Sequence, residues 1–246
     1  MLENYSFLNG KTAIVTGAAG GIGEAICFGL AKYHINMLLV GRNANKLHVL
    51  AEKLNATGVQ TVCLAGNLRE MGFIDDMINT SVERFGGIDI LVNNAGVAHH
   101  CVMEEMTVEQ YNEIMETNVR APYFLCRNAL KYLRQSDCAT IFNICSSASY
   151  IGYEKQSVYV ASKHALLGMS KTLAAEVYTQ GIRVHTISPG GVFTKMVSVT
   201  RPDLAGTSMI QPEDIANIVS FCLENRMSNA VIDEFRINRS TKMPFT

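Results

Sequence analysis

Short apolar runs alternate with longer amphipathic segments along almost the whole chain, and this alternation constrains the fold more than any other feature. The short runs are typical of buried strands, and the longer segments carry apolar residues at helical spacing. We expect strands at 12–16, 37–40, 59–65, 88–92, 140–144, 183–187 and 231–237, and helices at 21–33, 46–55, 71–85, 107–133, 158–179 and 215–223. Such units predict a doubly wound, Rossmann-type α/β fold with a mostly parallel, seven-stranded sheet and helices on both faces.

The segment 107–133 carries its own start signal. Thr107 followed by Gln110 is the pattern of a capping box, in which each side chain bonds the backbone N–H of the other residue. Pro122 lies inside the same segment, and a proline within a helix predicts a kink.

The length of the chain, 246 residues, fits one large domain, and we find no internal repeat or linker. We therefore predict a single domain over 1–246. The least regular stretch, 193–212, contains Pro202 and Gly206 and follows the sixth predicted strand. A doubly wound sheet opens its ligand crevice beyond the carboxyl ends of its strands, so we predict a substrate flap at about 193–212.

The composition excludes several classes of protein. Hydrophobic residues make up 48% of the chain and charged residues 17%, which excludes disorder. The net charge of -1, without a basic cluster, argues against nucleic acid as a partner. No apolar run approaches the ~20 residues of a membrane helix, and the N-terminus lacks the pattern of a signal peptide. Seven cysteines without a CxxC pair indicate reduced thiols and a cytoplasmic protein.

A glycine-rich turn joins the first predicted strand to its helix. The sequence there is Thr16-Gly17-Ala18-Ala19-Gly20-Gly21-Ile22-Gly23. Glycines suit a backbone that turns tightly and approaches a pyrophosphate, and the helix N-terminus supplies free N–H groups. A plain strand-to-helix turn rich in glycine is the alternative, but the strand–turn–helix context favours a dinucleotide site.

The end of the second predicted strand indicates which dinucleotide. A site for NAD usually places a carboxylate there, on the ribose 2′-hydroxyl, but no Asp or Glu lies between Glu24 and Glu52. Instead the chain reads Gly41-Arg42-Asn43, which provides space and a planar cation for a 2′-phosphate. Arg42 as a solvated surface residue is the alternative. We favour NADP(H) over NAD(H).

Tyr159 and Lys163 are four residues apart on a predicted helix, so their side chains lie on one face. A nearby ammonium lowers the cost of a tyrosinate, which lets the phenol act as a general acid or base. No other Tyr and Lys in the chain have this order and spacing. Ser146 follows the strand at 140–144, where its hydroxyl could bond a substrate carbonyl or, alternatively, cap a turn.

These motifs together resemble a classical short-chain dehydrogenase/reductase. The family pattern T-G-x-x-x-G-x-G is present as Thr16 to Gly23, and N-N-A-G as Asn93 to Gly96. Asn118, Ser146, Tyr159, Lys163, then Pro189-Gly190 and Thr194 follow in the family order. The agreement extends from about Leu8 to Ile237.

The resemblance implies a role for each matching residue. Tyr159 would be the general acid in reduction and the base in oxidation, with Lys163 supporting the tyrosinate and holding the nicotinamide ribose. Ser146 would orient the carbonyl, and Asn118 would hold a water in a proton relay to Lys163. The implied cofactor-binding residues, with Tyr159 and Lys163, are Gly17, Gly20, Gly21, Ile22, Gly23, Arg42, Asn43, Asn67, Leu68, Asn94, Ala95, Gly96, Pro189, Gly190, Val192 and Thr194.

The chain departs from the family pattern in three places. Asn67 stands where an Asp often bonds the adenine, and its side-chain oxygen can make the same bond. Cys145 replaces a Ser or Gly, and we interpret it as a small buried residue rather than a reactive thiol. The C-terminus reads Asp233-Glu234-Phe235-Arg236-Ile237-Asn238-Arg239-Ser240 and lacks the family's Asp-Gly-Gly, which puts the usual tetramer contact in doubt. A homodimer or a homotetramer is expected.

Other residues suggest the substrate pocket more than a further site. His99, His100 and Cys101 are adjacent, and side chains that alternate in direction rarely bind one metal, so we predict no metal site. The pocket is expected to involve 98–102, 150–157 and the flap. Tyr150, Tyr153 and Phe193 indicate an apolar substrate, and Met196 and Met209 belong to the same segments.

Three functions remain open. The first is an NADP(H)-dependent oxidoreductase acting on a small-molecule carbonyl or secondary alcohol. The second is a reductase of 3-ketoacyl chains on an acyl carrier protein. That activity needs a basic docking face at the entrance, and Asp137 and Gln180 at the corresponding segments argue against it. The third is a catalytically silent NADP(H)-binding regulatory protein, which the intact catalytic residues disfavour.

Overall fold

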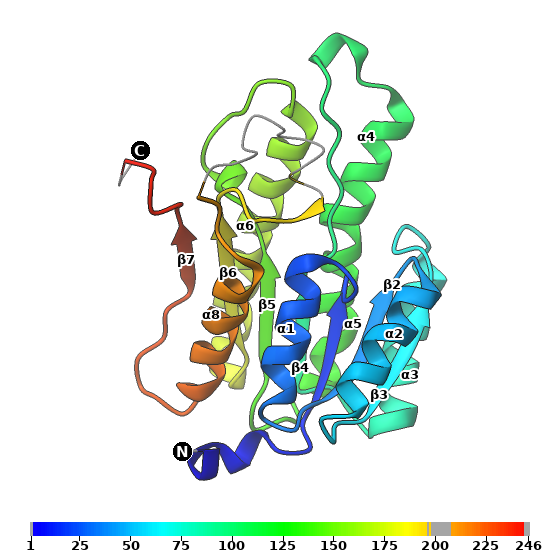
Figure 1. Ribbon diagram of the computed structural model, residues 1–246, viewed down its shortest axis with the longest axis vertical. Helices are drawn as coiled ribbons and strands as arrows, with labels where there is room; N and C mark the ends of the chain where they lie inside the picture. The colour runs from blue at the N-terminus through cyan, green and yellow to red at the C-terminus, as the bar shows by residue number, and fades with distance from the viewer. Residues whose placement is uncertain (1, 196, 198–207, 244–246) are drawn as a thin grey trace.

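A computed structural model describes residues 2–195, 197 and 208–243 and shows one seven-stranded sheet in the order β3-β2-β1-β4-β5-β6-β7 (Figure 1). The strands are β1 Thr12–Thr16, β2 Asn36–Gly41, β3 Thr61–Ala65, β4 Ile90–Asn93, β5 Thr140–Ile144, β6 Arg183–Pro189 and β7 Glu234–Ile237. Every pairing between these strands is parallel. The predicted α/β class and Rossmann-type sheet are confirmed, and the sheet is wholly parallel rather than mostly so.

Helices cover both faces of the sheet. The longer helices are α1 Gly21–Ala31, α2 Ala44–Asn55, α3 Met71–Phe85, α4 Val108–Met115, α5 Ala121–Leu133, α6 Ser157–Val177 and α8 Pro212–Glu224. Short turns of helix are η1 Leu2–Leu8, η2 Met103–Glu105, η4 Ser147–Ser149 and η5 Tyr178–Gln180. Buried residues of α1, α2 and α8 form one apolar cluster with the sheet, and those of α3, α5 and α6 form another on the opposite face. Along β1, Ala13 and Val15 join the first cluster and Ile14 joins the second, as the alternation of side chains in a strand requires.

The long helix predicted from Thr107 begins as expected but is interrupted earlier than expected. The capping box between Thr107 and Gln110 is confirmed. The interruption is a π-helical turn, η3 Glu116–Arg120, which lies just before Pro122 and not at it. Proline has no N–H and its ring crowds the carbonyl four residues earlier, so the backbone adjusts upstream of the ring. The wider turn contains Thr117 and Asn118, and both are buried.

The strand order creates a crevice. The chain moves outward from β1 to β2 and β3, then returns to place β4 on the other side of β1. The loops that follow β1 and β4 therefore part in opposite directions, and such a switch point is where open α/β sheets bind ligands. At the end of β6, a bridge between Val192 and Ile210 joins the two ends of the segment predicted as a flap.

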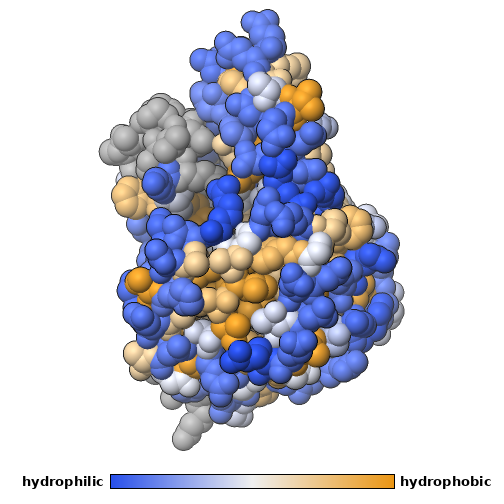
Figure 2. Space-filling view, turned by 90° about the vertical axis from the view of Figure 1, so that its right-hand side faces the viewer, coloured by the Kyte–Doolittle hydropathy of each residue, from blue (hydrophilic) through white to orange (hydrophobic). Residues whose placement is uncertain are grey.

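The two edge strands of the sheet are β3 and β7. Strand β3 forms one edge, and Val62, Cys63 and Leu64 are only half-buried there. Figure 2 shows the side of the molecule that carries α2 and α3, where apolar surface crosses the middle of a mostly hydrophilic face. Strand β7 forms the other edge.

Among the helices of the described residues, none combines the length and hydropathy that crossing a membrane requires.

Candidate functional site

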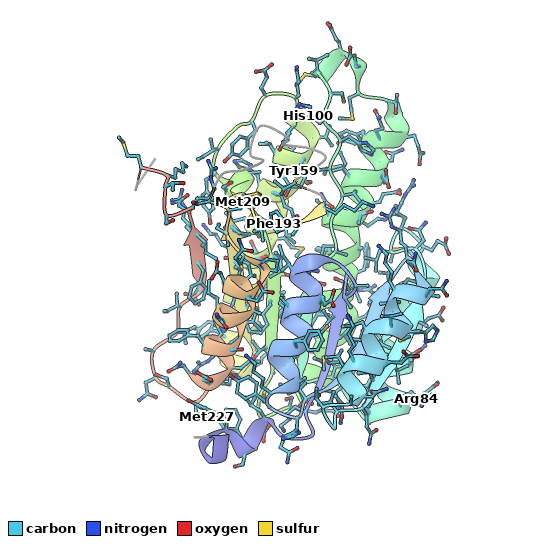
Figure 3. All side chains as sticks on the ribbon, in the orientation of Figure 1. Arg84, His100, Tyr159, Phe193, Met209 and Met227 are labelled. Atoms are coloured by element: carbon cyan, nitrogen blue, oxygen red, sulfur yellow. The ribbon has the colours of Figure 1, made fainter. Side chains whose placement is uncertain are left out.

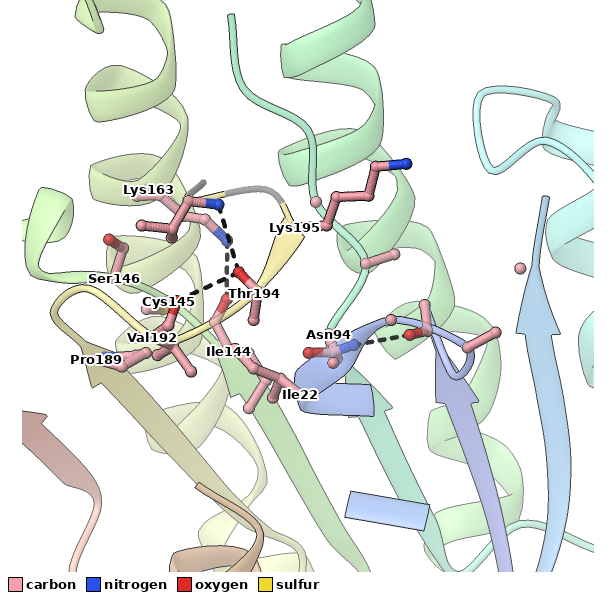
Figure 4. A pocket seen from close by; sticks show the side chains of 18 of the residues that line it. Ile22, Asn94, Ile144, Cys145, Ser146, Lys163, Pro189, Val192, Thr194 and Lys195 are labelled. Carbon is pink, nitrogen blue, oxygen red and sulfur yellow. Dashed lines mark hydrogen bonds between the residues drawn. The ribbon is translucent and has the colours of Figure 1, made fainter. Parts of the chain in front are cut away.

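A cavity of about 360 Å³ lies at the carboxyl ends of the central strands (Figure 4). The residues predicted for a dinucleotide or for catalysis that line it are Gly17, Gly20, Gly21, Ile22, Arg42, Asn43, Asn94, Ala95, Gly96, Ser146, Tyr159, Lys163, Pro189, Gly190, Val192 and Thr194. Figure 4 shows Ser146 and Lys163 on one side of this cavity and Asn94 on the other. The predicted residues Gly23, Asn67, Leu68 and Asn118 do not line it.

The glycine-rich turn is packed too tightly for other residues. Gly17 has a φ of +64°, a left-handed conformation that favours glycine. A Cβ on Gly23 would overlap the carbonyl oxygen of Gly17, so the start of α1 lies directly against the turn. Gly23 therefore does not line the cavity but allows α1 to pack directly against the turn. The N–H groups of the first turn of α1 have no partners within the helix and are free to bind an anion.

The loop after β4 is bonded to the same turn. The side-chain amide of Asn94 donates to the carbonyl oxygens of Thr16 and Gly17 at 3.0 and 3.2 Å. The Thr16 hydroxyl oxygen accepts from the backbone N–H groups of Asn94 and Ala95 at 3.0 and 3.1 Å. Asn94 was expected to bind the cofactor, and it does line the cavity while its amide group holds the turn in place.

Lys163 is held by the main chain at the opposite side of the cavity. Its side chain is buried, and its ammonium donates to the carbonyl oxygen of Ile144 at 2.8 Å. The ammonium lies 5.8 Å from the centroid of the Tyr159 ring, and Tyr159 is half-buried. The predicted proximity of this pair on one face of α6 is confirmed. A fixed cation beside a phenol stabilises the charge that develops when the phenol gives up its proton.

Ser146 follows β5 and begins the short turn η4. Its hydroxyl oxygen accepts the backbone N–H of Ala148 at 3.1 Å, so the capping contact that we considered for this serine is present. An oxygen that accepts in this way keeps its own hydrogen to donate to a ligand. The preceding Cys145 is buried, and burial raises the pKa of its thiol to about 11, as expected of an unreactive cysteine.

Asn118 is placed behind the cavity by the π turn of η3. Its amide oxygen accepts the backbone N–H of Val97 at 2.9 Å, and its amide nitrogen donates to the Val97 carbonyl at 2.9 Å and to Ser162 Oγ at 3.0 Å. Because Ser162 lies beside Lys163 on α6, Asn118 joins the loop after β4 to the helix that carries Tyr159. Its amide group is therefore a bridge between two walls of the site.

The end of β2 provides cations. Arg42 is mostly exposed, with 74% of its side chain accessible, and its guanidinium lies 3.6 Å from Glu113 on α4. Asn43 caps α2 by accepting the N–H of Lys46 at 3.0 Å. Lys46 also lines the cavity, and our reading of the sequence missed it. A cation in the first turn of a helix opposes the helix dipole, and this was the available signal for an anionic ligand.

Among the described residues, the charged side chains that line the cavity are all cationic. Four cationic residues line it, namely Arg42, Lys46, Lys163 and Lys195, and no carboxylate does so among the described residues. Lys195 belongs to the segment predicted as a flap, and its place at the cavity agrees with that expectation. The cavity is therefore suited to a ligand with several negative charges.

The loops expected around a substrate have contacts of their own. His99 Nε2 lies 2.8 Å from Glu113, and Cys101 donates its N–H to the carbonyl oxygen of Lys155 at 3.0 Å. Tyr153 shares a hydrogen bond of 2.9 Å with Ser147. Within the part of the chain that the structure describes, no cluster of three metal-ligating side chains is found.

Of the residues expected near a substrate, Tyr150 does not line the cavity, and Met196 lies outside the described residues. The Tyr150 hydroxyl donates to Glu234 on β7. The expected place of Tyr150 in a substrate pocket stays a prediction. Figure 3 shows Phe193 and Met209 at the same end of the molecule as Tyr159, and Phe193 is exposed. Met196 lies outside the described residues, as does much of the predicted flap.

Asn67 lies away from the described cavity. Its side-chain oxygen accepts the N–H of Arg69 at 3.1 Å, which forms a tight turn after β3. A carboxamide oxygen has two lone pairs, so this bond leaves one for another donor. Leu68 packs against the apolar cluster of α3 and α5.

Asp137 and Gln180, from which we argued against a carrier-bound substrate, lie at the amino ends of the strands, whereas the cavity lies at the carboxyl ends. Asp137 precedes β5 and pairs with Lys11, and Gln180 precedes β6 and accepts from Arg134. The cavity lies at the other ends of these strands. That argument from the sequence is therefore wrong, because neither residue borders an entrance to the site.

Comparisons with known proteins agree with this geometry. A model of the short chain dehydrogenase family matches residues 11–205. The chain is 36% identical to D-beta-hydroxybutyrate dehydrogenase of Rhizobium meliloti over 85% of this chain and 82% of that protein. It is 33% identical to 3-oxoacyl-(acyl-carrier-protein) reductase of Rickettsia bellii, covering 94% of this chain and 96% of that one.

A solved structure is similar throughout its length. L-sorbose reductase from Gluconobacter frateurii, complexed with NADPH and L-sorbose, superposes with a TM-score of 0.86 at 28% identity. The match covers 94% of this chain and 96% of that one. With the family pattern matched over most of its length and the fold and cavity in agreement, the chain belongs to the short-chain dehydrogenase family of oxidoreductases.

Proposed function

We propose that the protein is an NADP(H)-dependent oxidoreductase that interconverts a small-molecule carbonyl and its secondary alcohol, with Tyr159 as the general acid and base. The observation that carries the proposal is one cavity that joins the glycine-rich turn and three cations to the catalytic candidates. The cations are Arg42, Lys46 and Lys195, and the catalytic candidates are Ser146, Tyr159 and Lys163. A protein that only binds the cofactor would need the glycine-rich turn and the cations but not Ser146 and Tyr159.

The chain's residues fit a nicotinamide dinucleotide. The tight glycine turn and the free N–H groups of α1 suit a pyrophosphate, because no side chain keeps the ligand from the backbone. Arg42, Lys46 and Asn43 would hold a 2′-phosphate, and Pro189, Gly190, Val192 and Thr194 would hold the nicotinamide end. When bound, the cofactor supplies or accepts the hydride.

The catalytic residues would manage the proton and the carbonyl oxygen. Ser146 donates a hydrogen bond to that oxygen, since its own oxygen is already used as an acceptor for Ala148. Tyr159 gives its proton to the oxygen during reduction and takes it back during oxidation. Lys163, fixed on the Ile144 carbonyl, stabilises the tyrosinate. Asn118 would hold a water that returns a proton towards Lys163.

A 3-oxoacyl chain on a carrier protein is the second candidate substrate. Lys195 lines the cavity, and Phe193, two residues earlier in the chain, is exposed. A segment that carries both a cation and an exposed apolar side chain suits an acyl chain with a phosphate-bearing carrier arm. The similarity to the Rickettsia reductase over most of both chains supports the same substrate class.

The quaternary structure and location form part of the proposal. We infer a homodimer or a homotetramer in the cytoplasm. The seven cysteines are free and five of them are buried, which suits a reducing compartment.

The test measures consumption of NADPH and of NADH with four substrates: acetoacetate, an acetoacetyl thioester, a ketose and a simple diketone. Faster turnover with NADPH on a free ketone supports the proposal, and a preference for the thioester selects the second candidate. Thermal shift with each cofactor separates binding from turnover. A melting point raised by NADPH without turnover, matched by a Tyr159→Phe variant, would indicate the silent regulatory protein instead.

A further inference from the structure

The C-terminal strand β7 contacts the active site at two places. It pairs with the end of β6, so that Pro189 lies opposite Ile237. Beyond this pairing, Gly190 donates its N–H to the Ile237 carbonyl at 2.8 Å. Gly190 lines the cavity. The strand in which the sequence departs from its family therefore supports one wall of the site.

The second contact uses the residues that make the departure. Tyr150 donates its hydroxyl to Glu234 Oε1, and the other oxygen of Glu234 lies 3.1 Å from the ammonium of Lys171 on α6. The guanidinium of Arg236 lies over the Tyr150 ring, 3.9 Å from its centroid. Glu234 and Arg236 thus contact the hydroxyl and the ring of one tyrosine, and each contact depends on a charged side chain.

Tyr150 ends the turn that begins at Ser146. Within this turn Ser149 donates its N–H to the Ser146 carbonyl at 2.9 Å, and Tyr150 donates its own to the Ser147 carbonyl at 3.1 Å. Ser149 Oγ donates to the carbonyl oxygen of Lys163 at 3.0 Å. The Tyr150 ring also packs on a small apolar cluster that contains Cys145. Because these contacts join Tyr150 to the turn, a shift of its ring would also displace the Ser146 hydroxyl.

We propose that Tyr150 and Glu234 are positioning residues, which hold the turn after β5 so that the Ser146 hydroxyl meets the substrate oxygen. This inference rests on the proposed function, because it assigns Ser146 the task of binding that oxygen. Burial and the bond to Glu234 raise the pKa of Tyr150 to about 12, so the tyrosine remains a donor at neutral pH.

The experiment compares four variants in steady-state assays with NADPH and the best ketone. Tyr150→Phe keeps the ring and loses only the hydroxyl, and Glu234→Ala loses the acceptor. Each is expected to lower kcat by about tenfold with the KM for NADPH unchanged, since small misplacements of a catalytic group are costly. Glu234→Gln keeps an accepting oxygen and should retain most of the activity. Asp233→Asn, an equal loss of charge on the adjacent exposed residue, is the control and should match the wild type.

Combining the variants tests whether they act through one contact. The Tyr150→Phe/Glu234→Ala double variant should be no slower than the slower single variant, because both changes remove the same bond. Wild-type kcat in Tyr150→Phe would overturn the inference. So would losses that multiply in the double variant, or an equal loss in Asp233→Asn.

A readout without turnover separates this inference from the proposed function. If the wild-type protein binds NADPH but reduces no carbonyl, the proposed function has failed. Amide hydrogen exchange then tests the positioning, because the Ala148 N–H is protected by Ser146. Tyr150→Phe and Glu234→Ala should expose this amide to faster exchange, and Asp233→Asn should not. Unchanged protection in all three would overturn the inference.

Discussion

The two ends of the cavity are built in different ways. At the catalytic end, Lys163 is buried and bonded to a backbone carbonyl, and Asn118 makes three hydrogen bonds to the loop and helix around it. At the ribose end, Arg42 and Lys46 are exposed, and Arg42 contacts a single carboxylate at 3.6 Å. The side chains at the catalytic end are thus held in fixed positions, where a proton must be transferred. The positive charge at the ribose end is instead carried by long, exposed side chains. Cofactor choice should be easy to alter without loss of the fold, and catalysis should not.

The catalytic end should show the largest effect. Removing one hydroxyl in Tyr159→Phe removes the proton donor and leaves the ring in place. We expect kcat to fall by about 10²- to 10⁴-fold, the usual worth of a general acid. The affinity for NADPH and the melting temperature should stay near those of the wild type. Turnover at the full rate would mean that another group moves the proton.

The ribose end should show an intermediate effect confined to one cofactor. Arg42→Ala and Lys46→Ala are each expected to weaken NADPH binding by about 10- to 100-fold, the worth of a hydrogen bond to a charged group. Binding of NADH should hardly change, because it has no 2′-phosphate.

Titration calorimetry with both cofactors measures these affinities. Lys53→Ala removes a cation from the far end of the same helix α2 and serves as a control. Equal losses for NADPH and NADH in Arg42→Ala would show that the arginine does not read the phosphate.

The same difference explains what could be predicted from the sequence. Strand and helix positions follow from periodicity, and 71–85 and 140–144 were predicted to the residue. The glycine turn and the Tyr159–Lys163 pair are local patterns, so they could be read directly. The π turn could not, because the effect of Pro122 appears upstream of the proline.

Residues that depend on packing between distant segments escaped prediction. Tyr150 was expected in the pocket, and its contacts with Glu234 and Arg236, far along the chain, were not predicted. Asp137 and Gln180 were misjudged for another reason. Both precede strands that the sequence predicted as parallel, so their place at the amino ends, opposite the cavity, already followed from the predicted fold.

A buried histidine and an exposed one should differ in their effect on stability. His185 on β6 is buried; its Nδ1 donates to the Ile232 carbonyl, and its Nε2 has no hydrogen-bond partner within the described residues. Burial lowers the pKa of His185, so the native state resists a proton that the unfolded chain takes up below about pH 6.5. Stability should therefore fall as the pH drops through that value, by at most about 1.4 kcal/mol per pH unit from this group.

Urea unfolding at about pH 7.5 and about pH 5 measures this contribution. In His185→Asn the amide can still donate to Ile232, and the loss of stability on acidification should be smaller than in the wild type. The exposed His48 on α2 provides the control, since His48→Asn should leave the pH dependence unchanged. A pH dependence in His185→Asn equal to that of the wild type would contradict the assignment.

The smallest expected effect belongs to Glu113, which lies beside the ribose end. One of its oxygens lies 3.6 Å from Arg42 and the other 2.8 Å from His99. Arg42 must turn from this carboxylate towards a 2′-phosphate, and an exposed ion pair is worth only about 0.2–1 kcal/mol. Glu113→Gln should therefore strengthen NADPH binding by about 1.4- to 5-fold and leave NADH binding unchanged.

Ionic strength distinguishes the electrostatic origin of that change. The gain in Glu113→Gln should shrink as salt screens the pair, because Arg42 is exposed. Glu109→Gln removes a carboxylate from the same helix α4 that pairs with Arg69 instead, and it should change neither affinity. Weaker NADPH binding in Glu113→Gln would mean the reverse role, in which the carboxylate orients the guanidinium for the phosphate. The ribose end would then be held in place by a side chain of α4, and the contrast with the catalytic end would be one of degree.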